Sequence, residues 1–400
     1  MRAQCARCRI TLVSVSSHPL NHSIALTLAA LMLMVVMCTT TLMSVQTAGI
    51  LLHAGLFSGP EELARRGMDG LAIVVIFVTV LAPAGKLLST LYVLIRLREA
   101  APPRHLRRVF ALAEKLRPWS MIEVFVLGVF VAYVKLGDLV HIVLDTGVYA
   151  LLALTVVIIW ADTSIDRELI WERLGRGDAR IRLDPQRSSL GDPAGCETCG
   201  LVSDLRGEHQ RCPRCNSALH PRKPGSLSRT WALTIAAAVL YIPANYFPVL
   251  TVVQLGAGAP STILGGVEEL LESHMYPLAA LVFFASIAVP MLKLVGLSIM
   301  LISAQTGHTA WLRDRTRLYY VVRWVGRWSM IDIFMEALLG ALVRFGALVT
   351  IEPGIGAVAF CGVVILTMFA AETFDPRIMW DAAAARTKTA AGQGSPLRVS

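Results

Sequence analysis

The stretch Trp119-Ser120-Met121-Ile122, followed by the acid Glu123, recurs later as Trp328-Ser329-Met330-Ile331, followed by Asp332. Around these two stretches the chain matches itself at a shift of roughly 207 to 210 residues. Further matches are Pro83-Ala84-Gly85-Lys86 with Pro290-Met291-Leu292-Lys293, Ala161-Asp162-Thr163 with Ala371-Glu372-Thr373, and Cys5-Ala6-Arg7-Cys8 with Cys212-Pro213-Arg214-Cys215. A period this long indicates a whole domain present twice, not a solenoid of short repeats.

The composition is that of a membrane protein. Of the 400 residues, 55% are hydrophobic and 16% are charged, and the mean hydropathy is +0.61. Several apolar runs reach the about 20 residues that are needed to cross a bilayer. We predict eight spans, at residues 24–45, 71–95, 121–137, 147–161, 231–253, 277–302, 330–350 and 354–372. The predicted fold class is an all-α polytopic membrane protein of two repeats with about four transmembrane helices each, plus small zinc-ribbon modules that contain the β-structure.

The basic residues predict how these spans are oriented. Arginines and lysines crowd the loop between the second and third spans of each repeat, whereas the opposite loops are mostly acidic or neutral. The positive-inside rule therefore places the basic loops, both cysteine-bearing segments and both termini in the cytoplasm. An even number of spans per repeat makes the two copies parallel. Attraction to anionic lipid explains the net charge of +9 without a nucleic acid partner.

We expect five segments along the chain. They are a partial N-terminal zinc-ribbon half at 1–23, the first transmembrane repeat at 24–172, a cytoplasmic zinc ribbon and linker at 173–230, the second transmembrane repeat at 231–380, and a disordered tail at 381–400. The tail is predicted to be disordered because alanine, threonine, glycine and serine dominate it.

Four cysteines in the linker carry the strongest chemical signal. Cys196 and Cys199 form one CxxC pair, and Cys212 and Cys215 form a second pair after a short insert. Two such pairs predict a zinc ribbon with four thiolates around one ion. Because protein would fill all four positions, we expect a structural metal and not a catalytic one. Iron in a rubredoxin-like site, or four unrelated cysteines, are the alternatives.

The first repeat carries only half of this pattern. Cys5 and Cys8 match the second pair, and nothing upstream in the sequence supplies the first pair. Three interpretations compete: the missing pair precedes the natural start, the half-site is an unmetallated remnant, or His18 and His22 complete a Cys2His2 site.

Charged residues inside the spans are the candidates for mechanism. Each second span has a lysine after a proline, Lys86 or Lys293, and each third span opens with an acid, Glu123 or Asp332. A charge at bilayer depth costs a few kcal/mol unless it is paired or lines a wet cavity. We hypothesise that Lys86 faces Glu123 and that Lys293 faces Asp332, either as functional groups or as purely structural ion pairs.

One motif is found only in the second repeat. Pro243-Ala244-Asn245-Tyr246-Phe247-Pro248 is predicted to interrupt the fifth span, and broken spans commonly line a substrate path. The chain has no GxxxxGK[ST] loop for nucleotide phosphates and no evident Ser/His/Asp grouping. We therefore do not expect an enzyme.

Taken together, these motifs resemble the paraquat-inducible protein A family. The resemblance rests on the double CxxC segment, Pro243–Pro248, Pro260–Leu264, Val289–Lys293, Gly326–Asp332 and Thr373–Arg377, and it covers about residues 5–380. The chain departs from the family pattern in its first cysteine pair and in the first span, which lacks the proline–asparagine motif.

The resemblance implies an inner-membrane protein of Gram-negative bacteria. It would work with a periplasmic MCE-domain partner and move phospholipid between the membranes. A lipid head group would then meet Lys293, Ser329, Asp332, Asn245 and Thr373. Lys293 would attract the phosphate, and Asp332 could take up and release a proton that couples transport to the proton gradient.

Two other function classes compete with transport. One is a membrane redox or stress protein with a metal site, which would need a redox-active metal or a haem or quinone site. The other is a scaffold whose ribbon binds a cytosolic partner. Purified protein that is colourless, holds zinc and carries bound lipid would favour transport over both.

Overall fold

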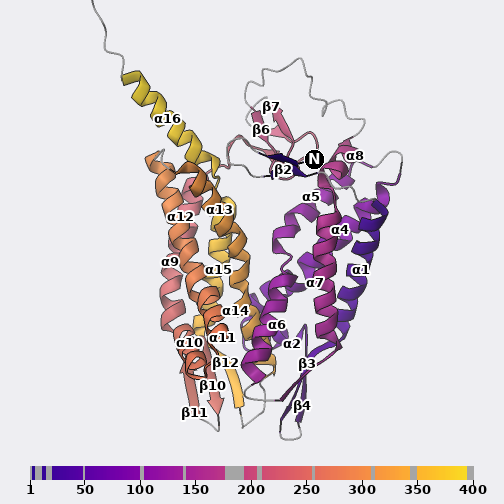
Figure 1. Ribbon diagram of the computed structural model, residues 1–400, viewed down its shortest axis with the longest axis vertical. Helices are drawn as coiled ribbons and strands as arrows, with labels where there is room; N and C mark the ends of the chain where they lie inside the picture. Colours follow the sequence, from indigo (N-terminus) through magenta and orange to yellow (C-terminus); the bar gives the residue numbers. More distant parts are fainter. Residues whose placement is uncertain are drawn as a thin grey trace, which may run out of the picture. The chain divides into compact units, whose positions relative to one another are not determined.

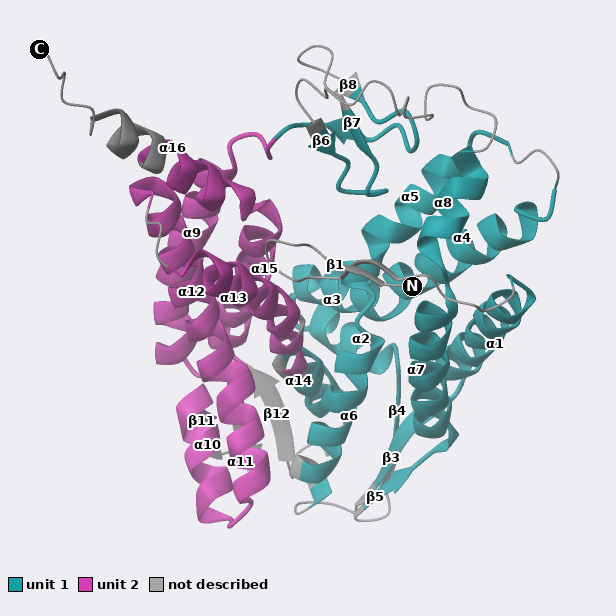
Figure 2. Ribbon diagram, turned by 45° about the horizontal axis from the view of Figure 1, so that its top comes forward, with its two compact units in different colours: residues 1–5, 10–221, 333–351 teal, residues 6–9, 222–332, 352–400 magenta. Residues whose placement is uncertain are grey.

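The computed structural model describes residues 2–4, 11–14, 20–47, 50–99, 103–137, 141–175, 193–204, 210–254, 257–307, 311–342 and 349–393. The chain forms two compact units, which Figure 2 colours separately. Unit 1 comprises residues 1–5, 10–221 and 333–351, and unit 2 comprises residues 6–9, 222–332 and 352–400. Each unit therefore holds most of one repeat.

Unit 1 begins with two short strands and continues with the helices of repeat one. Its elements are β1 (Arg2–Gln4), β2 (Thr11–Ser14), α1 (Leu20–Thr39), β3 (Thr41–Thr47), β4 (Ile50–Gly55), α2 (Ser58–Arg65), α3 (Asp69–Ile76), η1 (Phe77–Leu81), α4 (Ala82–Arg96), α5 (Leu106–Leu116), η2 (Arg117–Trp119), α6 (Ile122–Gly137), β5 (His141–Leu144), α7 (Thr146–Ser164), α8 (Arg167–Gly175), β6 (Pro193–Gly195), β7 (Val202–Asp204), β8 (Gln210–Arg211) and β9 (Ala218–Leu219) (Figure 1).

The second repeat gives the same order of elements. These are α9 (Ser226–Tyr246), β10 (Leu250–Gln254), β11 (Ala257–Ser261), α10 (Ile263–Glu272), α11 (Tyr276–Phe283), η4 (Phe284–Ala288), α12 (Val289–Thr306), α13 (Leu312–Val325), η5 (Gly326–Met330), α14 (Ile331–Leu342), β12 (Val349–Pro353), α15 (Ile355–Thr373) and α16 (Arg377–Gln393).

Seven helical runs among the described residues are long and apolar enough to cross a membrane. They are Leu20–Thr39, Asp69–Arg96, Leu106–Val134, Thr146–Ser164, Ser226–Tyr246, Tyr276–Thr306 and Ile355–Thr373. These runs confirm the predicted fold class of a mostly helical, polytopic membrane protein. The eighth predicted span, 330–350, contains α14, and residues 343–348 lie outside the described part of the chain.

The second span of each repeat contains a π-helical turn at a matched position. In repeat one, η1 joins α3 to α4, and in repeat two, η4 joins α11 to α12. Each turn is followed within two residues by a proline, Pro83 or Pro290, at the start of the next helix. A π-turn holds one extra residue and removes the regular backbone pairing, so a proline without an N–H is tolerated there.

Each repeat also has a three-stranded sheet that was not predicted. The strand orders are β4-β3-β5 and β11-β10-β12, and the pairs β3–β4, β3–β5 and β10–β11 are antiparallel. The predicted spans 24–45 and 231–253 were therefore too long, because α1 ends at Thr39 and α9 ends at Tyr246. The buried strand residues Leu42, Met43 and Val45 are as apolar as a helix, so hydropathy alone cannot separate the strand from the span.

Two further predictions on local structure were wrong. Pro243 does not break the fifth span, because α9 continues through it and ends three residues later at Tyr246. The amide of Phe247 still donates to the Pro243 carbonyl at 3.0 Å, so the last turn keeps its hydrogen bond. The tail predicted to be disordered from residue 381 is helical to Gln393, as its run of alanines favours.

Part of the second repeat belongs to unit 1. Residues 333–351, which include most of α14, group with the helices of repeat one. Phe334 meets Phe125 edge to face at 5.4 Å between ring centroids, and a Cβ at Gly59 would lie 3.0 Å from the Ala337 carbonyl oxygen. Glycine at position 59 thus lets α2 and α14 approach closely.

Candidate functional site

The four cysteines of the linker lie on two similar turns. Cys196 and Cys199 follow β6, and Cys212 and Cys215 follow β8. In the first turn, the amide of Gly200 donates to the Cys196 carbonyl at 2.9 Å, and in the second, the amide of Asn216 donates to the Cys212 carbonyl at 2.9 Å. Gly200 (φ +71°) and Asn216 (φ +64°) both have left-handed backbones, which glycine and asparagine adopt most readily.

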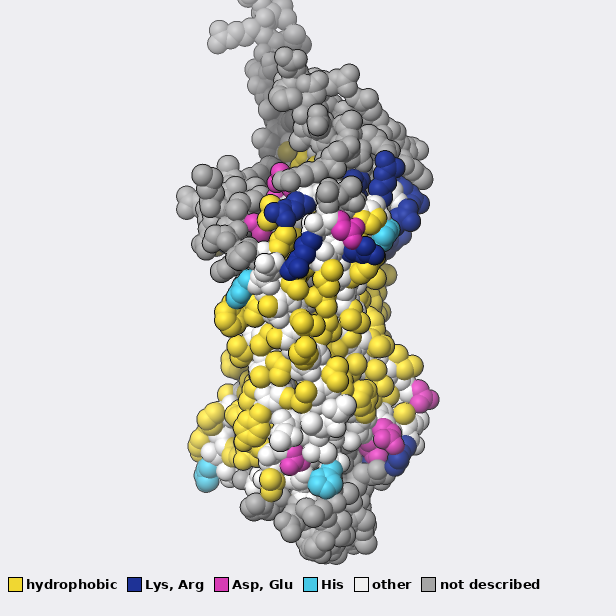
Figure 3. Space-filling model, turned by 90° about the vertical axis from the view of Figure 1, so that its right-hand side faces the viewer, with side chains coloured by type: hydrophobic (Ala, Val, Ile, Leu, Met, Phe, Trp, Pro, Cys, Tyr) yellow, Lys and Arg dark blue, Asp and Glu magenta, His cyan; other side chains and the backbone are white. Residues whose placement is uncertain are grey.

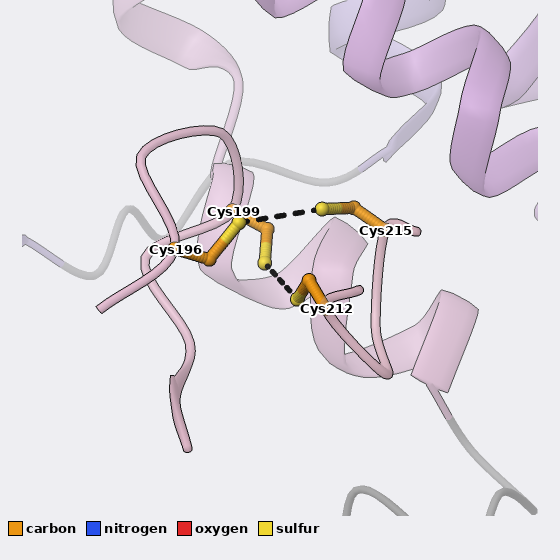
Figure 4. A group of neighbouring side chains, drawn as sticks. All are labelled: Cys196, Cys199, Cys212 and Cys215. Carbon is orange, nitrogen blue, oxygen red and sulfur yellow. Dashed lines mark hydrogen bonds between the residues drawn. The ribbon is translucent and has the colours of Figure 1, made fainter. Parts of the chain in front are cut away.

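The four sulfur atoms converge on one point (Figure 4). All four lie within 4.8 Å of one another, and the Sγ atoms of Cys196 and Cys215 are 3.4 Å apart. Those of Cys199 and Cys212 are 3.5 Å apart. A tetrahedral metal bound at about 2.3 Å separates its sulfur ligands by roughly 3.8 Å, so a small adjustment would fit an ion here.

The environment of the cluster favours ionised sulfur at two positions. Hydrogen bonds from neighbouring thiols, first that of Cys199 and then that of Cys212, lower the pKa of Cys196 to about 6. Hydrogen bonds from the other three thiols, first that of Cys196, hold the pKa of Cys215 well below its ordinary value. Thiolates and not thiols bind metals, so the arrangement can hold a metal ion. The cluster is buried, since each cysteine is at most 4% exposed.

The cysteine cluster is part of the hydrophobic core of unit 1. It packs with Leu97 at the end of α4, Leu106 and Phe110 of α5, and Trp171 and Leu174 of α8. Arg214, which lies between the last two cysteines, pairs with Glu168 of α8 at 3.2 Å. The ribbon precedes repeat two in the sequence, yet it is built into the end of repeat one.

The half-site of the first repeat stays a prediction. Cys5, Cys8 and His18 lie outside the described residues, although β1 and β2, which flank the two cysteines, form an antiparallel pair. His22 is in α1, where its ring meets Trp160 of α7 edge to face at 5.6 Å.

Lys86 of repeat one forms an ion pair near the end of a span. Its ammonium donates to Asp162 Oδ2 at 2.6 Å, and the two side chains are 8% and 24% exposed. We had expected Glu123 to face Lys86, and the contact that the structure shows is with Asp162, in the last turn of α7. The pair links α4 to α7.

Lys293 of repeat two is more deeply buried and has a different partner. Its side chain is 2% exposed, and its ammonium donates to Thr367 Oγ1 of α15 at 3.3 Å. A Cβ at Gly326 would lie 3.3 Å from Lys293 Cε and 3.7 Å from Nζ, so glycine leaves room for the lysine. Among the described side chains, no carboxylate contacts this ammonium.

A second polar group, the Ser329 hydroxyl, lies one turn after Gly326. Ser329 belongs to the same 3-10 turn as Gly326, on the same face three residues later. Its side chain is fully buried, and its hydroxyl has no hydrogen-bond partner among the described residues. Asp332 follows in α14, but its side chain lies outside the described part of the chain, so its pairing with Lys293 remains a hypothesis.

The other two predicted head-group residues lie at opposite ends of the α9–α15 pair. The Thr373 hydroxyl is 3.2 Å from that of Thr230 in the first turns of α9, whereas Asn245 is in the last turn of α9 and donates to the Tyr241 carbonyl at 2.8 Å. Thr230 and Asn245 are about 22 Å apart at 1.5 Å per residue. The structure therefore does not bring Asn245 and Thr373 into one cluster.

The acid at the end of α15 that matches Asp162 is bound by an arginine and not by Lys293. Glu372 matches Asp162 in the repeat, but both of its oxygens accept from Arg323, at 2.9 and 3.0 Å. The position that matches Arg323 in repeat one is Glu114, which pairs with Arg167 at 3.3 Å. A reversal of charge at this position gives the two repeats different ion pairs.

Asp375 lies just beyond α15 and is 1% exposed. Its carboxylate accepts from Arg377 and from the backbone amide of Lys223. Burial acts to raise the pKa of Asp375, but the hydrogen bonds from Arg377 outweigh it and lower the pKa below its ordinary value.

Sequence reasoning missed two of these residues as site members. The repeat match of Asp162 with Glu372 is visible in the sequence, but it does not identify Asp162 as the partner of Lys86. Thr367 does not stand out by itself, because a threonine in an apolar helix is ordinary. The signal that could have found it is the comparison of the repeats, in which a hydroxyl replaces the apolar Val157.

Comparison with protein families gives a match over most of the chain. The model for "Paraquat-inducible protein A" matches residues 20–175 and again residues 227–384. The two matched segments correspond to the two repeats.

Curated relatives match nearly the full length. The chain is 34% identical over 383 residues to "Intermembrane transport protein PqiA" of Escherichia coli (strain K12), which covers 95% of this chain and 91% of the relative. It is 31% identical over 380 residues to "Lipophilic envelope-spanning tunnel protein A" of the same organism, a match that covers 95% of this chain and 86% of the relative. It is 28% identical over 393 residues to "Probable intermembrane transport protein" of Haemophilus influenzae, a match that covers 95% of this chain and 90% of the relative. No solved structure matches the chain.

Proposed function

Since the chain belongs to the paraquat-inducible protein A family, we propose that it is the inner-membrane subunit of an intermembrane phospholipid transport system. The names of its relatives and the seven apolar helical runs support this function. The relatives are named for transport and envelope spanning, so we do not assign an enzymatic reaction to the chain. The orientation is the one predicted from the basic loops, with both termini in the cytoplasm.

The proposed partner is a periplasmic MCE-domain protein that carries lipid onward. On this orientation, the three-stranded sheets lie on the periplasmic side, because β3 and β10 follow the ends of the spans α1 and α9. The sheets are therefore the surfaces that such a partner would meet first.

The observation that carries the proposal is the Lys293 ammonium. The side chain of Lys293 is 2% exposed inside an apolar helical bundle, and its ammonium contacts one hydroxyl and no carboxylate among the described residues, so it is placed to meet an anionic ligand. In the proposed mechanism, Lys293 attracts the lipid phosphate and the free Ser329 hydroxyl donates to it. Asn245 of α9 and Thr373 of α15, at opposite ends of this helix pair, mark where a head group would enter and leave.

Proton coupling is assigned to Asp332. An acid at membrane depth near a buried lysine could bind and release a proton as lipid moves. This assignment follows from position, since Asp332 lies three residues after Ser329.

The metal is proposed to be zinc, held by Cys196, Cys199, Cys212 and Cys215. Four thiolates on two CxxC turns are the donor set of structural zinc, and protein fills all four positions. When bound, zinc supplies folding stability to the ribbon and no chemistry.

The test is reconstituted lipid transfer. Purified protein in vesicles, with its MCE-domain partner added, should move fluorescent phospholipid to acceptor vesicles, faster with an imposed pH gradient. Asp332→Asn should abolish the response to the gradient. Transfer that ignores both the gradient and this substitution would remove the coupling, and a coloured, redox-active protein without bound lipid would favour the redox alternative.

A further inference from the structure

Basic and aromatic side chains gather where α4 ends and α5 begins. We call this set the α4–α5 basic patch: Tyr92, Arg96, Arg98, Arg104, His105 and Arg108. All six side chains are exposed. Figure 3 shows Lys and Arg side chains gathered beyond one edge of a belt of apolar side chains. The patch is at the ribbon end of unit 1, because Leu97 and Leu106 pack in the core that holds the cysteines.

The aromatic members of the patch are held in a defined arrangement. The Tyr92 hydroxyl is 2.9 Å from His105 Nε2, and the two rings stack with centroids 6.0 Å apart. The guanidinium carbon of Arg96 lies 5.9 Å from the Tyr92 ring centroid, within cation–π range. These contacts join the end of α4 to the residue just before α5.

Most of the positive charge in the patch is free to bind an anion. Arg96 pairs with Glu99, and Arg98 donates to the amide oxygen of Asn21 at 2.8 Å. The guanidinium groups of Arg104 and Arg108 contact no carboxylate among the described residues. The patch therefore keeps a net positive charge beside the membrane.

The patch lies directly at the edge of the lipid-facing surface. Leu88 and Ile95 of α4 are 56% and 50% exposed, and Tyr92, between them in sequence, is 39% exposed. Exposed leucine and isoleucine on a spanning helix contact acyl chains, and tyrosine is enriched at the level of the head groups. Arg96 is about one turn beyond Tyr92, at the depth of lipid phosphates.

The second repeat lacks this arrangement. At the positions that match Tyr92, Arg96 and Arg98 it has Ile299, Ser303 and Gln305. Asp314 takes the place of His105, and only the matches of Arg104 and Arg108, which are Arg313 and Arg317, remain basic. Arg317 contacts Asp314 at 3.4 Å. A topology signal alone would apply to both repeats, so the extra charges and aromatic rings of repeat one point to a ligand.

We propose that the α4–α5 basic patch binds the phosphodiester head group of an anionic phospholipid in the adjacent leaflet. Arginine forks match two phosphate oxygens, and the Tyr92 ring lies against the glycerol region. The bound lipid is a resident of the bilayer at the outer surface of repeat one. It is distinct from the lipid proposed to pass Lys293, so the two sites can fail separately.

The test compares equal charge removal at matched positions of the two repeats. The full chain is purified in neutral detergent, and binding of phosphatidylglycerol, with phosphatidylcholine as reference, is measured by native mass spectrometry. Arg104→Gln with Arg108→Gln should weaken phosphatidylglycerol binding about 30-fold, given about fivefold per basic residue. Arg313→Gln with Arg317→Gln, the control, should change it less than about threefold.

The other outcomes overturn the proposal. Equal loss of phosphatidylglycerol binding in both double variants would mean that the lipid responds to the overall positive charge and not to a site. No loss of binding in either variant would mean that the patch holds no lipid. Displacement of the lipid by inorganic phosphate at millimolar concentration would mean that the patch binds free anions. If the first double variant fails to fold, Tyr92→Ile with His105→Asp, which installs the second-repeat residues, must reproduce the loss.

Discussion

Lys86 and Lys293 occupy the same position in the two repeats, yet their surroundings differ. Each follows a π-turn and a proline at the start of a helix. Lys86 is paired with Asp162 at 2.6 Å, whereas Lys293 is held by the Thr367 hydroxyl at 3.3 Å, while the acid that matches Asp162 is bound by Arg323. The comparison teaches that duplication preserved the lysine and that a few substitutions around it changed which described side chain its ammonium contacts.

Loss of the proposed zinc site should have the largest effect of these changes, and unit 1 should be the part that is destabilised. Structural zinc contributes roughly 10 kcal/mol or more to the folding of small modules, and here the cysteines share a core with α5 and α8. Cys199→Ser with Cys212→Ser should therefore raise hydrogen exchange in α5 and α8 and leave α13 unchanged. Cys38→Ser is the control, and equal exchange in α13 would contradict the assignment of the ribbon to unit 1.

Replacing the two lysines should separate transport from stability. Lys293→Gln should slow lipid transfer about 10- to 100-fold, because a hydrogen bond to a charged group is worth about 1.5–3 kcal/mol. Lys86→Gln leaves Asp162 without this partner and should lower the free energy of unfolding. Removing one partner of a fully buried ion pair costs about 3–5 kcal/mol. We expect a smaller loss here, because the Asp162 side chain is 24% exposed.

Transfer per folded molecule should be unaffected by Lys86→Gln. Both variants are measured by vesicle transfer and by thermal unfolding. A transport defect of equal size in Lys86→Gln would break the comparison between the repeats.

Replacing the hydroxyl partner of Lys293 by the matching residue of repeat one should have a smaller effect on transfer than replacing the lysine. Thr367→Val installs the residue that matches Val157 and removes the hydroxyl partner of the ammonium. We expect transfer to fall about tenfold, since one hydrogen bond to a charge is lost. Thr155→Val is the matched control, because that hydroxyl donates to the Leu151 carbonyl of its own helix at 2.8 Å. Equal rates in the two variants would show that Thr367 does not position Lys293.

The smallest effect concerns acid pH and Asp375, which matches Ile165 in repeat one. Hydrogen bonds from Arg377 lower the pKa of Asp375, so its ionised form stabilises the folded state. This contribution is fully present above the ordinary pKa of about 4 and is lost as pH falls through the lowered folded value. Asp375→Asn should reduce the melting temperature at pH 7, and the difference from the unaltered chain should shrink below about pH 4. A difference that stays constant with pH would refute this linkage.

Much of the architecture could be predicted from the sequence because it depends on composition and repetition. The repeated Trp-Ser-Met-Ile stretch and the apolar runs gave the polytopic helical fold, and the spacing of Cys196, Cys199, Cys212 and Cys215 gave the cluster. The family match confirms the resemblance that the motifs had suggested. These features are local in the chain, so spacing and hydropathy are sufficient to find them.

The missing part depends on contacts between distant residues. The partner of Lys86 is 76 residues away, and that of Lys293 is 74 residues away. A sequence supplies several acids and hydroxyls for each lysine, and the packing of α7 and α15 selects among them. The sheets escaped prediction for a related reason, because β3 continues the apolar run of α1 after Thr39.

The π-turn at Phe77–Leu81 and its copy at Phe284–Ala288 have a consequence for ancestry. Such turns are rare, and both copies hold one at the same place before the proline. We infer that the single-copy ancestor already carried the distorted helix and its lysine, and that the charges around the lysine diverged after the halves were joined.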